Sequence, residues 1–66
     1  MKIIYASDDR YFRYVYISIM SLLESNLHND NIELVFIEQN VSENNINLLY
    51  LLAKQYKRDI EIIPFK

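Results

Sequence analysis

The chain has 66 residues, enough for one small domain, and the 52% of hydrophobic residues, with charges of both signs interspersed, is typical of a folded protein. The net charge is −2 and the seven lysines and arginines are scattered, which argues against binding to nucleic acid. The absence of cysteine excludes disulfides and thiolate metal sites, and the absence of glycine excludes glycine-rich phosphate-binding loops.

The chain shows no targeting or membrane signal. Lys2 precedes only four apolar residues before Ser7 and two aspartates interrupt the run, which is too short for a signal peptide. No apolar stretch approaches the roughly 20 residues of a membrane span. We therefore expect a cytoplasmic protein with no membrane span.

A short strand is expected at residues 2–6, where the apolar run MKIIYA ends before Ser7. The spacing predicts a helix over residues 11–26. Its apolar residues fall in two adjacent stripes, one of Tyr11, Val15, Ser18, Ile19 and Leu22 and one of Phe12, Tyr16, Met20 and Leu23. Because the two stripes merge into a wide apolar face, this helix is expected to be largely covered.

The clearest strand is residues 32–38, where four consecutive apolar residues, 34–37, are typical of a strand buried on both sides. A second helix is expected over residues 42–57. Ser42 provides an N-cap hydroxyl, but Asn45 stands where a capping box has Glu or Gln, so the box is incomplete.

A third strand is predicted at residues 60–64, in which Pro64 has no backbone N–H to donate. The order β-α-β-α-β predicts an α/β unit spanning residues 1–66, with a three-stranded parallel sheet and two right-handed crossover helices. Composition leaves two strand orders open. The order 3-2-1 puts both helices on one face and leaves the other bare, whereas 2-1-3 puts one helix on each face.

Ligands of open α/β sheets bind outside the carboxyl ends of the strands. That rule points to the segment after the first strand, residues 6–11 (ASDDRY), which combines two carboxylates, a guanidinium and a phenol. The alternative is a solvated loop in which Asp8 or Asp9 caps the next helix.

The pattern resembles the opening of glycosyltransferase family 8, whose members have the GT-A nucleotide-binding fold. The similarity runs through IIYASDDRYFRYVYISIMSLLESN, IELVFIEQNVSENNINLLYLLAKQY and RDIEIIPF in register. The resemblance implies the strand order 3-2-1 and places the chain in the N-terminal part of a larger domain. It further implies an enzyme that transfers a hexose from a UDP-sugar donor to an acceptor, of which this chain alone is inactive.

The resemblance assigns nucleotide-binding roles to five residues. Ala6 matches the strand-end position whose backbone contacts the nucleoside, and Ser7 beside it is included in the site. Asp8 accepts from the uracil ring N–H, and Tyr11 stacks on the uracil. Arg10 departs from the family, where asparagine donates to a uracil oxygen; arginine can also donate, from further away and with a permanent charge. An ionised carboxylate and a stacking ring suit uracil recognition.

Asp9 is expected to be structural, as a cap or a partner of Arg10. The resemblance implies manganese for the full-length family, held by an Asp-x-Asp motif and histidines that this chain lacks, so no catalytic or metal-binding residue is expected here. The single histidine, His28, is expected to be exposed. Four tyrosines at helical positions are assigned to packing: Tyr14, Tyr16, Tyr50 and Tyr56.

Competing hypotheses remain. A receiver-like signalling domain needs an aspartate at the end of the third strand, where this chain has Pro64, Phe65 and Lys66. A dehalogenase-like phosphatase needs Asp-x-Asp-x-Thr after the first strand, and residues 8–11 (DDRY) do not supply this motif. A non-catalytic, truncated α/β unit is compatible with the resemblance. Its bare sheet face predicts a homo-oligomer or a C-terminal continuation that covers the sheet.

Overall fold

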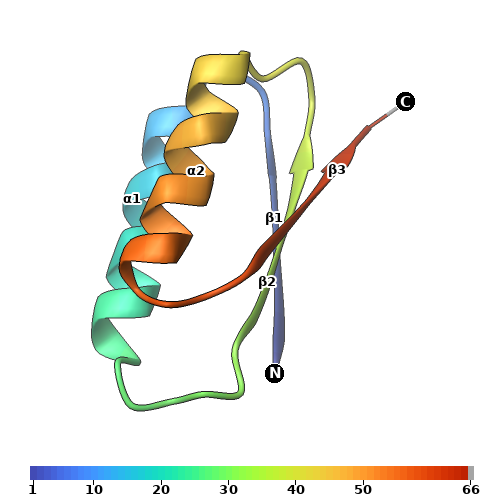
Figure 1. The fold of residues 1–66 in the computed structure, drawn as a ribbon. Helices are drawn as coiled ribbons and strands as arrows, with labels where there is room; N and C mark the ends of the chain where they lie inside the picture. The colour runs from blue at the N-terminus through green and yellow to red at the C-terminus, as the bar shows by residue number, and fades with distance from the viewer. Residues whose placement is uncertain (66) are drawn as a thin grey trace.

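The computed structural model describes residues 1–65, which form three strands and two helices in strict alternation (Figure 1). The elements are β1 (Lys2–Ser7), α1 (Phe12–Ser25), β2 (Glu33–Glu38), α2 (Glu43–Gln55) and β3 (Ile60–Pro64). Each lies within two residues of its predicted bounds. Neither helix in the described part of the chain is long and apolar enough to cross a lipid bilayer.

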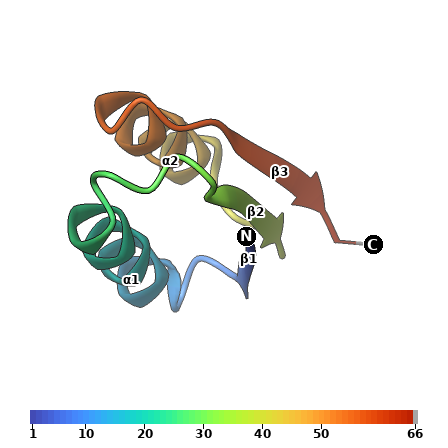
Figure 2. The ribbon, with the colours of Figure 1, turned by 90° about the horizontal axis from the view of Figure 1, so that it is seen from below.

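The three strands form one parallel sheet in the order β1-β2-β3. Ile3 lies beside Leu34, which lies beside Ile60, and the register continues without a break to the ends of the strands. Both helices cover the same face of the sheet, as Figure 2 shows from below. The structure therefore confirms the predicted α/β unit and selects the 3-2-1 order over the 2-1-3 order.

The core lies between the sheet and the helices. Its centre is Phe36, which is fully buried and meets the ring of Phe12 edge-on, with ring centroids 6.2 Å apart. The side chains buried around it are Ile19, Leu23, Leu34, Leu49 and Leu52. Since residues alternate along a strand, Leu34 and Phe36 face the helices, and Val35 and Ile37 face the other side.

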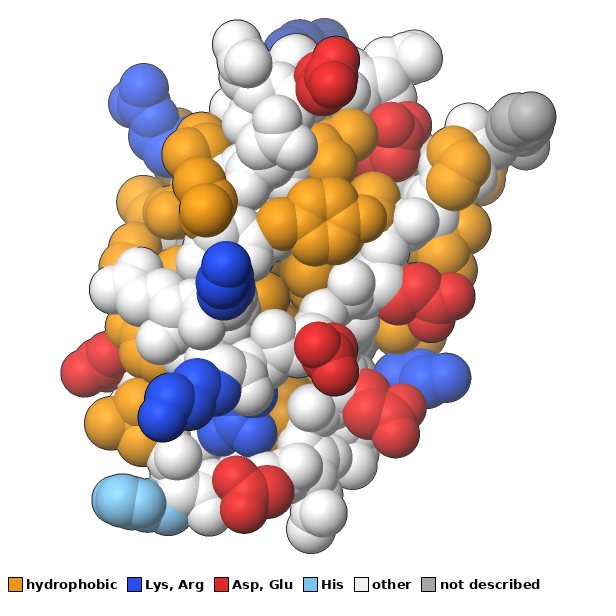
Figure 3. Space-filling view, in the orientation of Figure 1, with side chains coloured by type: hydrophobic (Ala, Val, Ile, Leu, Met, Phe, Trp, Pro, Cys, Tyr) orange, Lys and Arg blue, Asp and Glu red, His pale blue; other side chains and the backbone are white. Residues whose placement is uncertain are grey.

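Within residues 1–65, no helix or strand covers the face of the sheet away from the helices (Figure 2). Ile4 in β1 and Ile63 in β3 are 59% and 40% exposed there. Val35 is shielded, because it lies in register between Ile4 and Glu61. Figure 3 shows hydrophobic side chains at the surface beside the C-terminal end of the chain as well as over the helices.

The outer sides of the helices also carry apolar residues, and here two expectations were wrong. Helix α1 is not largely covered, since Tyr14 is 70% and Ile17 is 50% exposed. Tyr50 on α2 is exposed as well, so packing explains neither Tyr14 nor Tyr50. The helices form the outermost layer, and Tyr14 and Ile17 lie outside the two predicted stripes, on the outer side of α1. Tyr16 and Tyr56 do pack against the core.

Helix α2 ends without glycine in a conformation that normally uses it. Lys57 has φ 57°, its N–H bonds to the carbonyl of Lys54, and the N–H of Arg58 bonds to the carbonyl of Ala53 at 2.8 Å. These two bonds define a Schellman motif. The Arg58 side chain then donates to the carbonyl oxygen of Asn26, the C-cap of α1, so it stabilises the end of α1 rather than that of its own helix.

Candidate functional site

The loop between β1 and α1 lies at the carboxyl-end edge of the sheet, as expected for an open α/β unit. The N–H of Gln39 donates to the carbonyl of Ser7, and the N–H of Phe65 donates to the carbonyl of Glu38. These bonds continue the ladder to the ends of the three strands. The ends of the three strands are therefore hydrogen-bonded to one another, and residues 8–11 extend from the end of β1.

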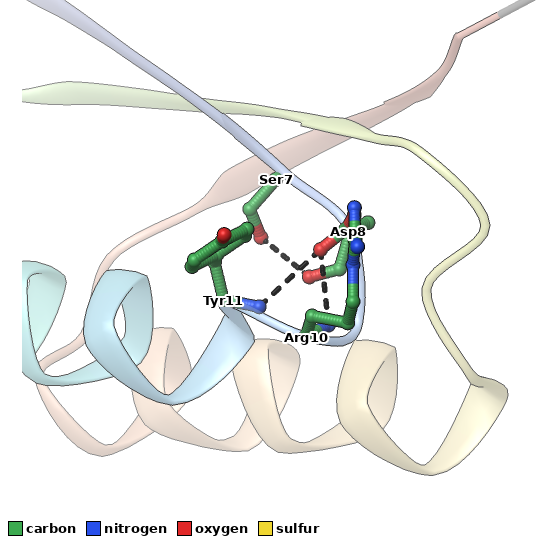
Figure 4. Close-up of polar contacts among 4 residues, drawn as sticks. All are labelled: Ser7, Asp8, Arg10 and Tyr11. Carbon is green, nitrogen blue, oxygen red and sulfur yellow. Dashed lines mark hydrogen bonds and ion pairs between the residues drawn. The ribbon is translucent and has the colours of Figure 1, made fainter.

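Asp8 organises this loop through both of its carboxylate oxygens (Figure 4). Oδ1 accepts from the backbone N–H groups of Arg10, at 3.0 Å, and Tyr11, at 3.3 Å. Oδ2 accepts from Nε and Nη2 of the Arg10 side chain, at 3.2 and 3.0 Å. The carboxylate thus holds the turn before α1 and also forms an ion pair. Both N–H groups from which it accepts precede the first helical residue, Phe12, so Asp8 does not cap α1 as in the alternative.

These contacts shift the pKa of Asp8. Desolvation of the carboxyl group raises its pKa, but the hydrogen bonds from the Arg10 side chain and from the N–H of Tyr11, with the charge of Arg10, outweigh it. The pKa of Asp8 therefore lies below its ordinary value. Asp8 is an ionised acceptor at neutral pH, which is the state that a ring N–H donor requires.

Arg10 and Tyr11 extend from the loop toward solvent. The Arg10 side chain is 80% exposed, and its guanidinium carbon lies 5.7 Å from the centre of the Tyr11 ring. Tyr11 is 57% exposed, and the Arg10 guanidinium lies over its ring. The predicted aromatic group, the carboxylate and the guanidinium are therefore brought together.

Ala6 and Ser7 support this cluster from the strand end. Ser7 is buried, and its hydroxyl donates to the carbonyl oxygen of Asp8 at 3.0 Å, which fixes the exit of the chain from β1. Ala6 is exposed on the open sheet face, in register with Ile37. Ala6 offers a small side chain beside the loop, and Ser7 is part of its scaffold.

Asp9 is structural, as expected, but its partners differ from the predicted ones. Its Oδ1 accepts from the backbone N–H of Ser42 at 2.8 Å and from the side-chain amide of Asn45 at 3.1 Å. It makes no ion pair with Arg10, whose guanidinium pairs with Asp8 instead. The incomplete capping box at Asn45 was the signal in the sequence for this contact, since it left the N–H of Ser42 without an acceptor.

A shallow hollow of about 440 Å³ lies beside the loop, between the first turns of the two helices. Its lining is Asp9, Arg10, Phe12, Arg13, Tyr14, Tyr16, Asn45 and Leu48. Asp8 and Tyr11 do not line this hollow. Arg10 lines it and also contacts Asp8 and Tyr11. The groups predicted to hold a uracil therefore lie on an open surface rather than in this hollow.

The donor set does not fit a divalent cation. Among residues 1–65, no group of three or more histidine, cysteine, aspartate or glutamate side chains lies close enough to hold a metal ion. Both acids of the loop are already bonded, Asp8 to Arg10 and Asp9 to Ser42. His28 is exposed in the loop after α1. No step of a reaction is therefore assigned to a metal on this chain.

The arrangement of residues 6–11 thus offers an ionised acceptor, a guanidinium and an aromatic ring at one end of β1. Its chemistry suits a flat ring with an N–H donor and an anionic group beside it, but both oxygens of Asp8 are already bonded within the loop. No protein-family model matches this chain, and neither a curated protein nor a solved structure matches it significantly.

Proposed function

We propose that this chain is the nucleotide-holding segment of a family 8-like glycosyltransferase and that it binds the uridine part of a UDP-sugar. The proposal rests on the resemblance carried by residues 6–11. It is supported by one observation in the structure, the convergence of the ionised Asp8 carboxylate and the exposed Tyr11 ring at the carboxyl end of β1.

The chemistry of these two groups favours uracil over cytosine. The ring N3 of uracil carries a hydrogen, which the carboxylate of Asp8 accepts, whereas N3 of cytosine is itself an acceptor and is repelled by a carboxylate. Stacking on Tyr11 contributes about 1–3 kcal/mol with little preference among bases. Asp8 therefore supplies the selectivity, and Tyr11 supplies affinity.

A titration followed by backbone amide NMR shifts tests the proposal. Uridine diphosphate is expected to shift the resonances of residues 6–11 at lower concentration than cytidine diphosphate does. The Asp8→Asn variant, which keeps an oxygen to accept from Tyr11, is expected to lose this difference. Asp30→Asn, an exposed acid in the distant α1–β2 loop, is the matched control. Equal responses to both nucleotides, or shifts confined to other residues, contradict uracil recognition.

In this proposal the chain contributes the nucleoside site of a cytoplasmic hexosyltransferase, and the acceptor pocket and catalytic groups lie outside it. Because residues 1–65 hold no group of side chains that fits a metal, these residues alone are expected to transfer no sugar. The manganese implied by the resemblance is assigned to sequence beyond these residues.

The open face of the sheet favours a second candidate function, that of a non-catalytic α/β unit that associates with a second copy. Ile4, Ile63 and Phe65 are exposed, and by strand alternation they lie on the side that no helix covers. Apolar residues gathered on one face of a small protein mark an interaction surface.

A further inference from the structure

Arg10 contacts both groups that the proposed function assigns to uracil binding, Asp8 and Tyr11. Its Nε and Nη2 donate hydrogen bonds to Oδ2 of Asp8, and its guanidinium carbon lies 5.7 Å from the centre of the Tyr11 ring. We propose, resting on that function, that Arg10 is a gate: it covers the base site in the unliganded protein and moves to the diphosphate when a uridine nucleotide binds.

Asp8 has no free acceptor position. An ionised carboxylate offers about four acceptor sites. Asp8 receives four hydrogen bonds, two at Oδ1 from the backbone and two at Oδ2 from the Arg10 side chain. A uracil N–H can be accepted only after one donor leaves.

The Arg10 side chain is the donor able to leave Asp8. The bonds at Oδ1 come from the backbone N–H groups of Arg10 and Tyr11 and hold the turn into α1, so losing them disturbs the loop. The Arg10 side chain is 80% exposed, and within residues 1–65 it bonds only to Asp8. Rotation of this side chain leaves the core and the backbone unchanged.

The freed guanidinium of Arg10 moves to the diphosphate in this proposal. A freed guanidinium beside a bound nucleotide meets the phosphate groups, and arginine binds phosphate through two parallel N–H bonds. The same residue therefore opposes binding of the nucleoside and favours binding of the diphosphate. This opposition distinguishes a gate from a side chain that merely positions Asp8.

Isothermal titration of uridine, cytidine and uridine diphosphate at low ionic strength, on the wild type and on Arg10→Gln, tests the gate. The variant is expected to bind uridine about two- to fivefold more tightly, the range of an exposed ion pair. Its preference for the diphosphate over uridine is expected to fall about tenfold, because the phosphate partner is lost. Arg13→Gln is the matched control, since it removes the same charge three residues later, and its affinity for uridine should equal that of the wild type.

The outcomes separate this inference from the proposed function. If Arg10→Gln binds both ligands more weakly, or neither affinity changes while uridine is still preferred over cytidine, the gate is wrong and the uracil site stands. If neither protein distinguishes uridine from cytidine, the proposed function is wrong and the gate fails with it. Tighter uridine binding in Arg10→Gln than in the wild type, with a reduced gain from phosphate, supports both.

Discussion

The carboxylate of Asp9 accepts the backbone N–H of Ser42 at 2.8 Å, across 33 positions of the sequence. Ser42 is the N-cap of α2, and in a capping box the side chain at the third helical position accepts this N–H. That position here is Asn45, which instead donates to the same oxygen of Asp9. The loop after β1 thus completes the cap of α2, and it links the first β-α unit to the second.

Replacing Asp9 is expected to lower stability more than an exposed acid normally does. Asp9→Ala leaves the N–H of Ser42 without its acceptor and should lower the free energy of unfolding by about 1 kcal/mol. Asp9→Asn keeps a carbonyl oxygen and should lose less. Urea denaturation followed by circular dichroism measures both. If Asp9→Ala is no less stable than the wild type, the contact contributes nothing to the cap.

The ion pair of Asp8 predicts a dependence of stability on pH. Because the pKa of Asp8 in the folded protein lies below its ordinary value of 3.8, its contribution is present above pH 3.8 and is lost as the pH falls through the folded value. NMR titration of the side-chain carboxyl is expected to show this lowered pKa, and Arg10→Gln is expected to raise it. A pKa at or above 3.8 in the wild type contradicts the contacts described here.

Tyr56 predicts a second dependence, at alkaline pH. Its hydroxyl donates to Oε2 of Glu24 at 2.6 Å, and this bond, together with desolvation and the charge of Glu24, raises the pKa of Tyr56 above 10.0. The stabilisation is therefore present below pH 10.0 and is lost as the pH rises through the folded pKa. Tyr56→Phe should be less stable than the wild type at neutral pH and equal to it once Tyr56 ionises.

Urea midpoints measured across this range check the expectation. Tyr14→Phe, at a 70% exposed residue, is the control and should match the wild type at every pH. A stability difference between Tyr56→Phe and the wild type that stays constant through the alkaline range would mean that the bond to Glu24 is not its source.

The open sheet face predicts association of the chain with itself at micromolar concentration. Burying a large aliphatic side chain contributes roughly 1.5–3 kcal/mol, so Ile4→Lys or Ile63→Lys should weaken association about tenfold or more. Ile17→Lys, on the outer side of α1, is the control because it removes an exposed isoleucine from the other layer. Sedimentation equilibrium decides the matter, and a monomeric wild type across this range rules out the association.

The fold was predictable because its signals are local. The run of residues 34–37 identifies the central strand, the helical spacing identifies both helices, and their alternation identifies a parallel sheet. The strand order was not predictable from composition, since both orders use the same right-handed crossovers. It followed only from the resemblance, and the structure confirms it.

The site was predictable in its members but not in their contacts. The rule for strand ends located Asp8 and Tyr11, but nothing local indicated that Arg10 pairs with Asp8 rather than with Asp9. The partner of Asp9 lies in another loop, which the sequence brings near only after the sheet has formed. Exposure of Tyr14 was predictable, because it lies two residues after the buried Phe12, on the opposite side of α1 and outside both predicted stripes.

The Schellman turn at Lys57 leaves this small protein room for improvement by design. A left-handed backbone costs a residue with a side chain about 1 kcal/mol relative to glycine, and the chain has no glycine to place there. Lys57→Gly should therefore raise the urea midpoint without altering residues 6–11, and an unchanged midpoint contradicts this. A stabilised background of this kind would let weakening substitutions in the loop be measured on a protein that remains folded.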